Sequence, residues 1–328
     1  MLEFVDNARM MLKEVVKIQP GQKLLVISDT YARSRAVAEV VNAVANSMGV
    51  VAVLTVMAPV TQVGQEPPPC IAAAMKAVDV ILEFADKHTI VHSTARKEAT
   101  ALGIKHFVLN TDASEDRLRT IIPIEDLKRI QARTEKLAGI MTRAGTARIT
   151  THYGADLTMS LKGRKALPIH PLSATGFGGL QDYAEAAVSP VEGTTEGLVV
   201  IDASVRAWGY VFRSPLSYEV KKGRAQADTV SSDVKEEAER FKKIILFDEN
   251  AGNCAAELGL GTSHTVPRIL QGDSMCDYAM EGNVHIAVGR NNDIGGETFS
   301  RVHQDVLMTR ATVMLDDICV IEDGKLKI

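Results

Sequence analysis

Apolar residues in the first part of the chain alternate between helical spacing and short continuous runs. Residues 4–15 carry apolar side chains at the helical period, and a turn at 19–22 leads into the apolar run 23–27. The same alternation predicts helices over 33–48, 71–77 and 94–102 and strands over 50–56, 78–84 and 105–110. Continuous apolar strands that alternate with amphipathic helices are typical of a parallel sheet covered on both faces. We therefore predict an α/β N-terminal domain with a parallel sheet over residues 1–144.

The pattern changes after a long charged helix predicted over 124–143. Short β-like runs separated by glycines follow at 147–152, 156–161, 197–201, 244–247 and 284–288. Runs of strands without alternating helices indicate an antiparallel, β-rich arrangement. We therefore predict a β-rich α+β domain over residues 145–328, and the candidate ligands described below make it the metal-binding catalytic domain.

The size and charge of the chain narrow its class of partner. Its 328 residues exceed the about 250–300 at which a single core stops growing, which supports two domains. A formal net charge of −4 gives no basic face, so we expect neither nucleic acid nor an anionic membrane as a partner. A small molecule or a short peptide is the expected substrate. The apolar runs are shorter than the about 18 residues that indicate a membrane span.

The cysteines and the N-terminal segment favour a cytoplasmic location. The four cysteines show no CxxC spacing, so we interpret them as free thiols in a reducing compartment. The first residues carry acidic side chains and a helical pattern in place of the basic region and apolar core of a signal peptide.

Ser28-Asp29-Thr30 stands where a GxGxxG fingerprint would follow the first strand. We therefore expect no dinucleotide cofactor.

A histidine and an aspartate two positions apart are the strongest candidates for chemistry. Side chains at i and i+2 of a strand point to the same face, so His303 and Asp305 can hold one metal ion from one side. An imidazole and a carboxylate together suit Zn, Mn, Fe or Co. His285 lies eighteen residues before His303, on an apolar run that ends at Gly289.

Glu257 is the second indication of a metal site. It lies in the apolar, glycine-containing run 255–262. A carboxylate among apolar residues is costly to bury unless it is paired or binds a metal. A salt bridge to a lysine or an arginine is the alternative explanation.

Four segments of the second domain resemble the aminopeptidase T-like metallopeptidases, also called the thermophilic metalloprotease family. These segments are 184–193, 257–262, 283–289 and 303–305. The resemblance implies a homodimer, and it implies a pair of divalent ions bound by Glu185, Glu257, His285, His303 and Asp305. The chain departs from the family in two places. The family's catalytic tyrosine is missing from the segment 290–296, and Ala184 stands where the family has a glycine.

The chain also resembles the 2,5-dihydroxypyridine 5,6-dioxygenases, which are mononuclear iron enzymes of similar size. The similarity lies in His92-Ser93 and in the segment 291–296 that leads to His303. It implies an acid/base role for His92. That family has a histidine ligand where this chain has Glu257, and apolar residues where this chain has Glu185 and His285.

Because all five ligand types of the peptidase family are present, we predict a dinuclear metallohydrolase of the aminopeptidase or amidase type that uses Zn, Mn or Co. A metal-activated water attacks the amide or peptide bond of a small substrate. Glu257 or Asp305 bridges the two ions, because a carboxylate has two oxygens. Glu185 is a terminal ligand or the general base, and His92 donates a proton to the leaving nitrogen.

Two other functions remain open at this point. The first alternative is a mononuclear non-haem Fe(II) dioxygenase that opens a hydroxypyridine-type N-heterocycle, with ligands drawn from His285, His303 and Asp305. The second is a non-enzymatic binding protein that has kept a decayed site. Three arginines are candidates for holding a substrate carboxylate, with an ordinary surface charge as the alternative for each: Arg268, Arg290 and Arg301.

Overall fold

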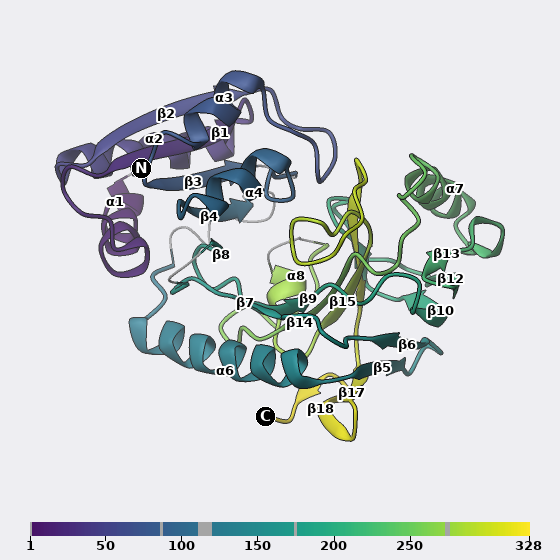
Figure 1. The fold of residues 1–328 in the computed structure, drawn as a ribbon. Helices are drawn as coiled ribbons and strands as arrows, with labels where there is room; N and C mark the ends of the chain where they lie inside the picture. Colours follow the sequence, from purple (N-terminus) through teal and green to yellow (C-terminus); the bar gives the residue numbers. More distant parts are fainter. Residues whose placement is uncertain (1, 86–87, 111–119, 174–175, 273–275) are drawn as a thin grey trace. The chain divides into compact units, whose positions relative to one another are not determined.

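The computed structural model describes residues 2–85, 88–110, 120–173, 176–272 and 276–328 (Figure 1). Its contacts divide the chain into two compact units, the first formed by Met1–Gln131 with Ile169–Ala184 and the second by Ala132–Pro168 with Glu185–Ile328. The second unit therefore begins inside the long helix α6 (Ile124–Arg143). The predicted domain boundary between residues 144 and 145 stays a prediction.

The first unit is built on a five-stranded parallel sheet. Its strands are β1 (Lys23–Asp29), β2 (Val51–Met57), β3 (Val80–Ala85), β4 (Lys105–Asn110) and β8 (Phe177–Gly179). They lie in the order β2-β1-β3-β4-β8, and every neighbouring pair is parallel. Among the described residues, the helices that lie wholly in this unit are α1 (Leu2–Met10) with a π-helical continuation (Met11–Val16), α2 (Ala32–Ser47), α3 (Pro69–Met75) and α4 (Thr94–Ala101).

The central strands β1 and β3 of this sheet are buried on both faces, whereas the edge strand β2 exposes Val51 and Val53. Leu25, Ile27 and Ile81 form one buried cluster with residues of α3 and α4. The alternate residues Leu24 and Val26 point to the opposite face and are equally buried. A strand covered on both faces requires a continuous apolar run, which is why the sequence pattern could identify these strands.

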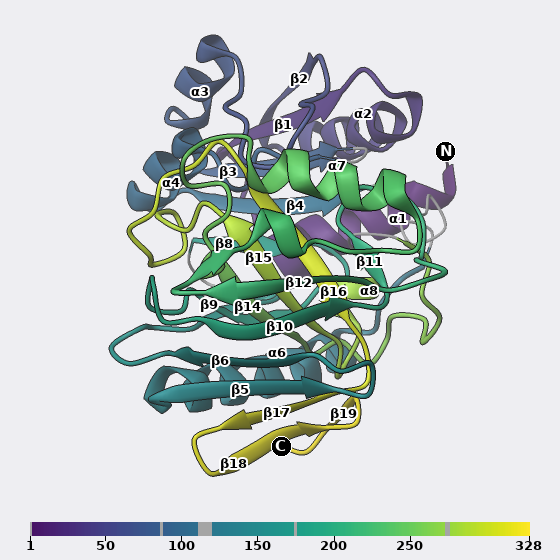
Figure 2. The ribbon, with the colours of Figure 1, turned by 90° about the vertical axis from the view of Figure 1, so that its right-hand side faces the viewer.

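The second unit contains two antiparallel sheets. The eight-stranded sheet has the order β13-β12-β10-β6-β5-β17-β18-β19, and Figure 2 shows most of these strands one after another. Its strands are β5 (Thr146–Thr151), β6 (Asp156–Ser160), β10 (Glu196–Ile201), β12 (Leu216–Lys221), β13 (Arg224–Ala225), β17 (Ala311–Leu315), β18 (Ile318–Glu322) and β19 (Lys325–Leu326).

The six-stranded sheet has the order β11-β16-β15-β14-β9-β7, with antiparallel pairing from β11 through β9. Its strands are β7 (Leu167–Ile169), β9 (Glu185–Val188), β11 (Ser204–Val205), β14 (Glu257–Gly261), β15 (Val284–Gly289) and β16 (His303–Met308). The remaining helical elements of the unit are a 3-10 turn (Ala227–Thr229), α7 (Lys235–Ile245) and α8 (Cys276–Ala279).

One hydrophobic core joins the two sheets. It contains Leu157 and Val199 from the eight-stranded sheet and Leu258, Ile286 and Val306 from the six-stranded sheet. Side chains alternate between the faces of a strand. The odd-numbered residues of β14, β15 and β16 therefore lie on the face of the six-stranded sheet that points away from this core. The predicted class, a parallel α/β domain followed by a β-rich domain, is confirmed.

One predicted strand, at 244–247, is wrong. Ala238, Phe241 and Ile245 are buried at helical spacing in α7, so the apolar residues at the start of that run complete a helix. Leu246 and Phe247 follow the helix and are exposed. The helix spacing only becomes visible when the charged residues before position 244 are included. Within the described residues, no helix has the length and apolar character needed to cross a bilayer.

Candidate metal centre

Four strands of the six-stranded sheet carry the candidate ligands on one face. The register places Ala287 of β15 between Glu257 of β14 and Asp305 of β16. One step along the sheet, His285 pairs with Gly259. Next to these strands, Glu185 on β9 pairs with Gly261 of β14, and His303 on β16 pairs with Gly289 of β15. The ligand side chains are thus neighbours because the strands that carry them are hydrogen-bonded to one another.

Small residues make room for these side chains. A Cβ placed on Gly259 would lie 2.1 Å from both Cε1 and Nε2 of His285. The imidazole of His285 therefore lies directly over the backbone of β14, and only glycine permits this approach. Ala287 likewise leaves the space between Glu257 and Asp305 open, because its side chain is a single methyl group.

The donor atoms converge on Glu257. His285 Nε2 lies 3.1 Å from Glu185 Oε2 and 3.8 Å from Glu257 Oε1. His303 Nε2 lies 3.2 Å from Glu257 Oε2 and 3.1 Å from Asp305 Oδ1. All five side chains are at most 5% exposed. The two oxygens of Glu257 face the two imidazoles.

His303 is oriented by the backbone. Its Nδ1 lies 2.8 Å from the carbonyl oxygen of Arg290. Because a carbonyl can only accept, Nδ1 carries the hydrogen of the neutral ring, and the lone pair of that ring is on Nε2. This arrangement, in which the second nitrogen of an imidazole donates to a backbone carbonyl, is common for metal-binding histidines.

The charges of the metal-free site compensate one another. Burial lowers the pKa of His303, but the carboxylates of Asp305 and Glu257 outweigh it and raise the pKa to about 10. Burial and the neighbouring carboxylates, above all Glu185, act on His285 in the same way, and its pKa is also about 10. Burial raises the pKa of Glu257, but hydrogen bonds to both histidines lower it to about 2. Burial also raises the pKa of Asp305, but the charges of His303 and Arg206 and the hydrogen bond to His303 hold it well below its ordinary value.

This donor set fits a divalent ion. Nitrogen and oxygen donors bind such ions at about 2.0–2.2 Å, so two donors at right angles lie about 3 Å apart. The separations of 3.1 and 3.2 Å around His303 Nε2 match that spacing. One donor atom each from Glu185, Glu257 and His285 also lie within 4.8 Å of one another.

Two residues of the site, Arg206 and Tyr278, were not predicted from the sequence. Arg206 Nη1 donates to Asp305 Oδ2 at 2.7 Å. The hydroxyl of Tyr278 donates to the backbone carbonyl of Asp305 at 3.3 Å, and its ring centroid lies 5.0 Å from that of His285. Arg206 is separated from Asp305 by 99 positions, so only the pairing of β11 with β16 reveals the contact.

The remaining predicted residues are His92 and the three candidate arginines. His92 belongs to the first unit and directly precedes Ser93, whose hydroxyl caps α4 by accepting from the backbone N of Arg96. Its acid/base role stays a prediction. Of the candidate arginines, Arg290 is buried, with its Nε donating to Asn292 Oδ1 at 2.9 Å. The exposed Arg268 pairs with Glu281, and Arg301 lies over the ring of Phe247.

Glu192 holds the segment 290–296, which lacks the catalytic tyrosine of the peptidase family. Glu192 Oε1 accepts from Asn291 Nδ2 at 2.7 Å and from the backbone N of Glu297 at 2.8 Å, while Oε2 pairs with Arg164. Asn291 Nδ2 also donates to the carbonyl of Ala255 at 2.8 Å. Glu192 therefore fixes the loop between β15 and β16, which carry His285 and His303.

We expect Glu192→Gln to destabilise the second unit by about 1–2 kcal/mol at pH 7, after allowing for solvent screening. Burial raises the pKa of Glu192, but the hydrogen bonds from Glu297 and Asn291 and the charge of Arg164 lower it below its ordinary 4.5. A depressed pKa stabilises the fold above the unfolded value, and this contribution is lost as the pH falls through the folded value. Urea unfolding at pH 7, 5 and 4 should therefore show a difference in the free energy of unfolding between the parent and Glu192→Gln that becomes smaller below about pH 4.5.

Glu196→Gln is the control for this prediction. Glu196 accepts one exposed hydrogen bond from the backbone N of Lys222. Its replacement should change stability by less than about 0.5 kcal/mol. A Glu192→Gln effect that is equally large at pH 4 and pH 7 would contradict the ionic origin of the stabilisation.

Comparison with known proteins gives a family match and several similar structures. The family model described as NicX, 2,5-dihydroxypyridine 5,6-dioxygenase, matches residues 4–328. The structure of 2,5-dihydroxypyridine dioxygenase from Pseudomonas putida KT2440 is similar with a TM-score of 0.78 at 16% identity, covering 99% of this chain and 96% of that one. Wild-type AmpT from Thermus thermophilus is similar with a TM-score of 0.73 at 14% identity, covering 99% of both chains. No curated protein matches the chain.

These matches correct the predicted activity. The dinuclear metallohydrolase of the aminopeptidase or amidase type is wrong, because the family that matches almost the whole chain is a dioxygenase family. The resemblance to the aminopeptidase T-like peptidases is confirmed for the fold alone. The predicted divalent metal cofactor is confirmed by the matching family together with the buried donor group around Glu257. Carboxylates and imidazoles suit several ions, so the ligand types did not distinguish hydrolysis from oxygen chemistry.

Proposed function

Because the chain belongs to the 2,5-dihydroxypyridine 5,6-dioxygenase family, we propose that it is a metal-dependent dioxygenase that opens a hydroxylated N-heterocycle. Such a reaction breaks one carbon–carbon bond of the ring and adds both atoms of O₂ to the two carbons. The family match supports the dioxygenase activity, and the observation that carries its metal dependence is the buried cluster of two imidazoles and three carboxylates on β9, β14, β15 and β16.

We propose that a single Fe(II) ion binds among these side chains. His285 and His303 supply the two imidazoles and Asp305 supplies the carboxylate, while the oxygens of Glu257 lie beside both rings. A two-histidine, one-carboxylate set with open positions is the ligand type of non-haem Fe(II) oxygenases, in which the iron supplies the activation of dioxygen. Glu185 Oε2 lies 3.1 Å from His285 Nε2 and is therefore a further candidate oxygen donor beside the ion.

The protein contributes order and a low dielectric to this chemistry. The ligands are carried by neighbouring strands, so the sheet holds them at fixed spacing before an ion arrives. Their burial removes competing water and strengthens each electrostatic interaction. A small-molecule substrate agrees with this class of enzyme. The homodimer and the cytoplasmic location stay predictions.

Oxygen consumption tests the proposal directly. The metal-stripped chain, reloaded anaerobically with Fe(II), should consume one O₂ for each molecule of 2,5-dihydroxypyridine that disappears. With ¹⁸O₂, mass spectrometry of the ring-opened product should show two heavy oxygens. Zn(II) is redox-silent, so the same chain loaded with Zn(II) should consume none.

Two outcomes would overturn the proposal. The first is an Fe(II)-loaded chain that consumes no O₂ with any member of a hydroxypyridine panel. The second is turnover of a substrate without oxygen by the Zn(II)-loaded chain.

A further inference from the structure

Arg206 lies directly against the candidate ligand Asp305. Its Nη1 donates to Asp305 Oδ2 at 2.7 Å, and its backbone N donates to the backbone carbonyl of Asp305 at 3.0 Å. The side chain of Arg206 is 11% exposed and that of Asp305 is 3% exposed. The pair is therefore shielded from water, where an ionic hydrogen bond is strong and removal of one partner is costly.

The backbone around Arg206 is fixed from several sides. Arg206 directly follows β11, which pairs with β16. Gln304 Nε2 donates to the carbonyl of Arg206 at 3.0 Å. Beyond it, Ala207 has a φ of 63°, a left-handed conformation that residues with a Cβ rarely adopt. The surrounding structure thus holds a tight turn at the point where the arginine reaches the ligand.

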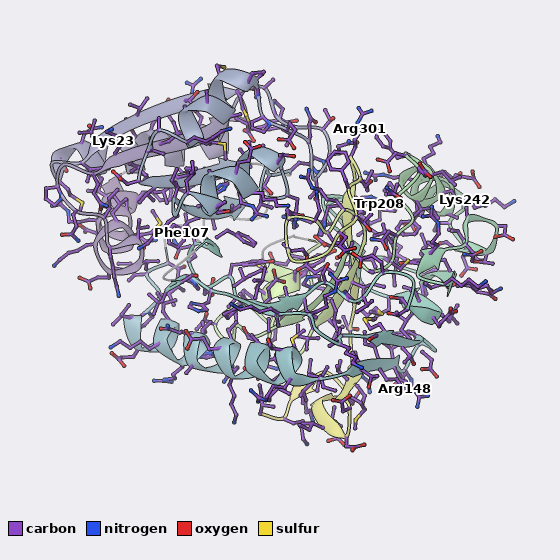
Figure 3. The ribbon with its side chains drawn as sticks, in the orientation of Figure 1. Lys23, Phe107, Arg148, Trp208, Lys242 and Arg301 are labelled. Atoms are coloured by element: carbon purple, nitrogen blue, oxygen red, sulfur yellow. The ribbon has the colours of Figure 1, made fainter. Side chains whose placement is uncertain are left out.

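Aromatic side chains cover this turn. The ring centroids of Trp208, Tyr210 and Phe212 lie 5.7 to 6.2 Å from one another. The guanidinium carbon of Arg240, on α7, lies 4.2 Å from the centroid of the Trp208 ring, which is labelled in Figure 3. Ring packing and the cation–π contact both hold the segment that follows Arg206. Arg206 therefore has little freedom to leave Asp305.

The two oxygens of Asp305 have different surroundings as a result. Oδ2 accepts from Arg206, while Oδ1 lies 3.1 Å from His303 Nε2 among the candidate donors. A carboxylate without such a partner can bind through both oxygens, either to one ion or between two. The arginine thus opposes the bridging role that the sequence suggested for Asp305.

We propose that Arg206 is a positioning residue that restricts Asp305 to a single metal-binding oxygen, Oδ1. The proposal rests on the proposed function, because it requires an ion at this site. An aspartate that binds through one oxygen occupies one position around the ion. Such an aspartate would leave the ion more room for other ligands.

Co(II) binding by Arg206 variants tests this proposal without enzyme activity. Arg206→Met, and Arg206→Gln as a second variant, should bind Co(II) about 10–100-fold more weakly than the parent chain, the usual effect of losing a residue that orients a ligand. At saturation their visible Co(II) absorption should differ from that of the parent, because Asp305 can then bind through both oxygens. Arg206→Lys keeps the charge, so its affinity should lie closer to that of the parent.

Arg133→Met is the matched control. Arg133 also forms an ion pair in the second unit, a partly buried one with Glu281, and it donates to the carbonyl of Thr262 at 3.2 Å. Its replacement should alter neither the Co(II) affinity nor the absorption. Circular dichroism of the metal-free variants establishes which of them are folded.

The possible failures are distinguishable. A parent-like Co(II) spectrum in a folded Arg206→Met or Arg206→Gln chain overturns the positioning role, whatever its affinity. A spectral change of the same size in Arg133→Met also overturns it, because the change would then follow from the loss of any buried ion pair. A parent chain that binds no Co(II) refutes the proposed metal site itself.

Discussion

Replacing His303 by alanine should remove the bound metal at micromolar ion concentrations and with it the oxygen-dependent turnover. His303 Nε2 lies 3.2 Å from a Glu257 oxygen and 3.1 Å from an Asp305 oxygen, so its loss separates both carboxylates from their shared neighbour. Substitution of a residue that only orients a ligand lowers the metal affinity about 10–100-fold, and we expect the loss of the ligand itself to lower it further. Metal analysis after gel filtration and an oxygen electrode measure the two effects.

His152→Ala is the control for this substitution. His152 lies in the turn after β5, in ring contact with Tyr153. Its substitution removes an imidazole from the same unit but leaves the donor cluster unchanged. Its metal content and turnover should equal those of the parent. If His303→Ala retained a full complement of metal, the cluster described above would not be the metal site.

Replacing Gly259 by alanine should disable the site through a single methyl group. The added Cβ would lie 2.1 Å from two atoms of the His285 ring, so the imidazole must move. A displacement of about 1 Å in a catalytic group can lower turnover about 100-fold. Overpacking of this kind also costs about 1–3 kcal/mol of stability. Turnover of the Fe(II)-loaded chain and urea unfolding of the metal-free chain measure the two effects.

Two further variants show where the Gly259→Ala effect originates. Gly139→Ala adds the same methyl group to α6, where it should be neutral or stabilise by up to about 1 kcal/mol. In a His285→Ala background the clash is gone, so Gly259→Ala should then cost much less stability than in the parent. An undiminished cost in that background would mean that the methyl group strains β14 itself and leaves His285 in place.

The elements that the sequence predicted well carry a long or uninterrupted apolar pattern. Strands β1 and β3 are buried on both faces and read as continuous apolar runs, and α6 shows a long helical period. The strand predicted at 244–247 was wrong because a run of four apolar residues fits a strand or the end of a helix equally well. The helix became clear only from Ala238 and Phe241, which lie before it.

The candidate site was predictable to the extent that its geometry is local. His303 and Asp305 alternate on one strand, and this spacing already placed them on the same face. The contact of Arg206 with Asp305 and the position of Gly259 under His285 depend on strand pairing, which single residues do not encode. The activity was missed for a chemical reason. The same carboxylates and imidazoles bind ions that hydrolyse and ions that react with oxygen, and the ion is not part of the sequence.

Trp208, which packs between Arg240 and the rings of Tyr210 and Phe212, is the single tryptophan of the chain. Its indole emission therefore comes from one place, the turn that follows Arg206 in the second unit. Unfolding of the parallel α/β unit contributes no tryptophan signal of its own, whereas circular dichroism records both units. A denaturation curve followed by the two signals together thus distinguishes one cooperative transition from two, without any added label.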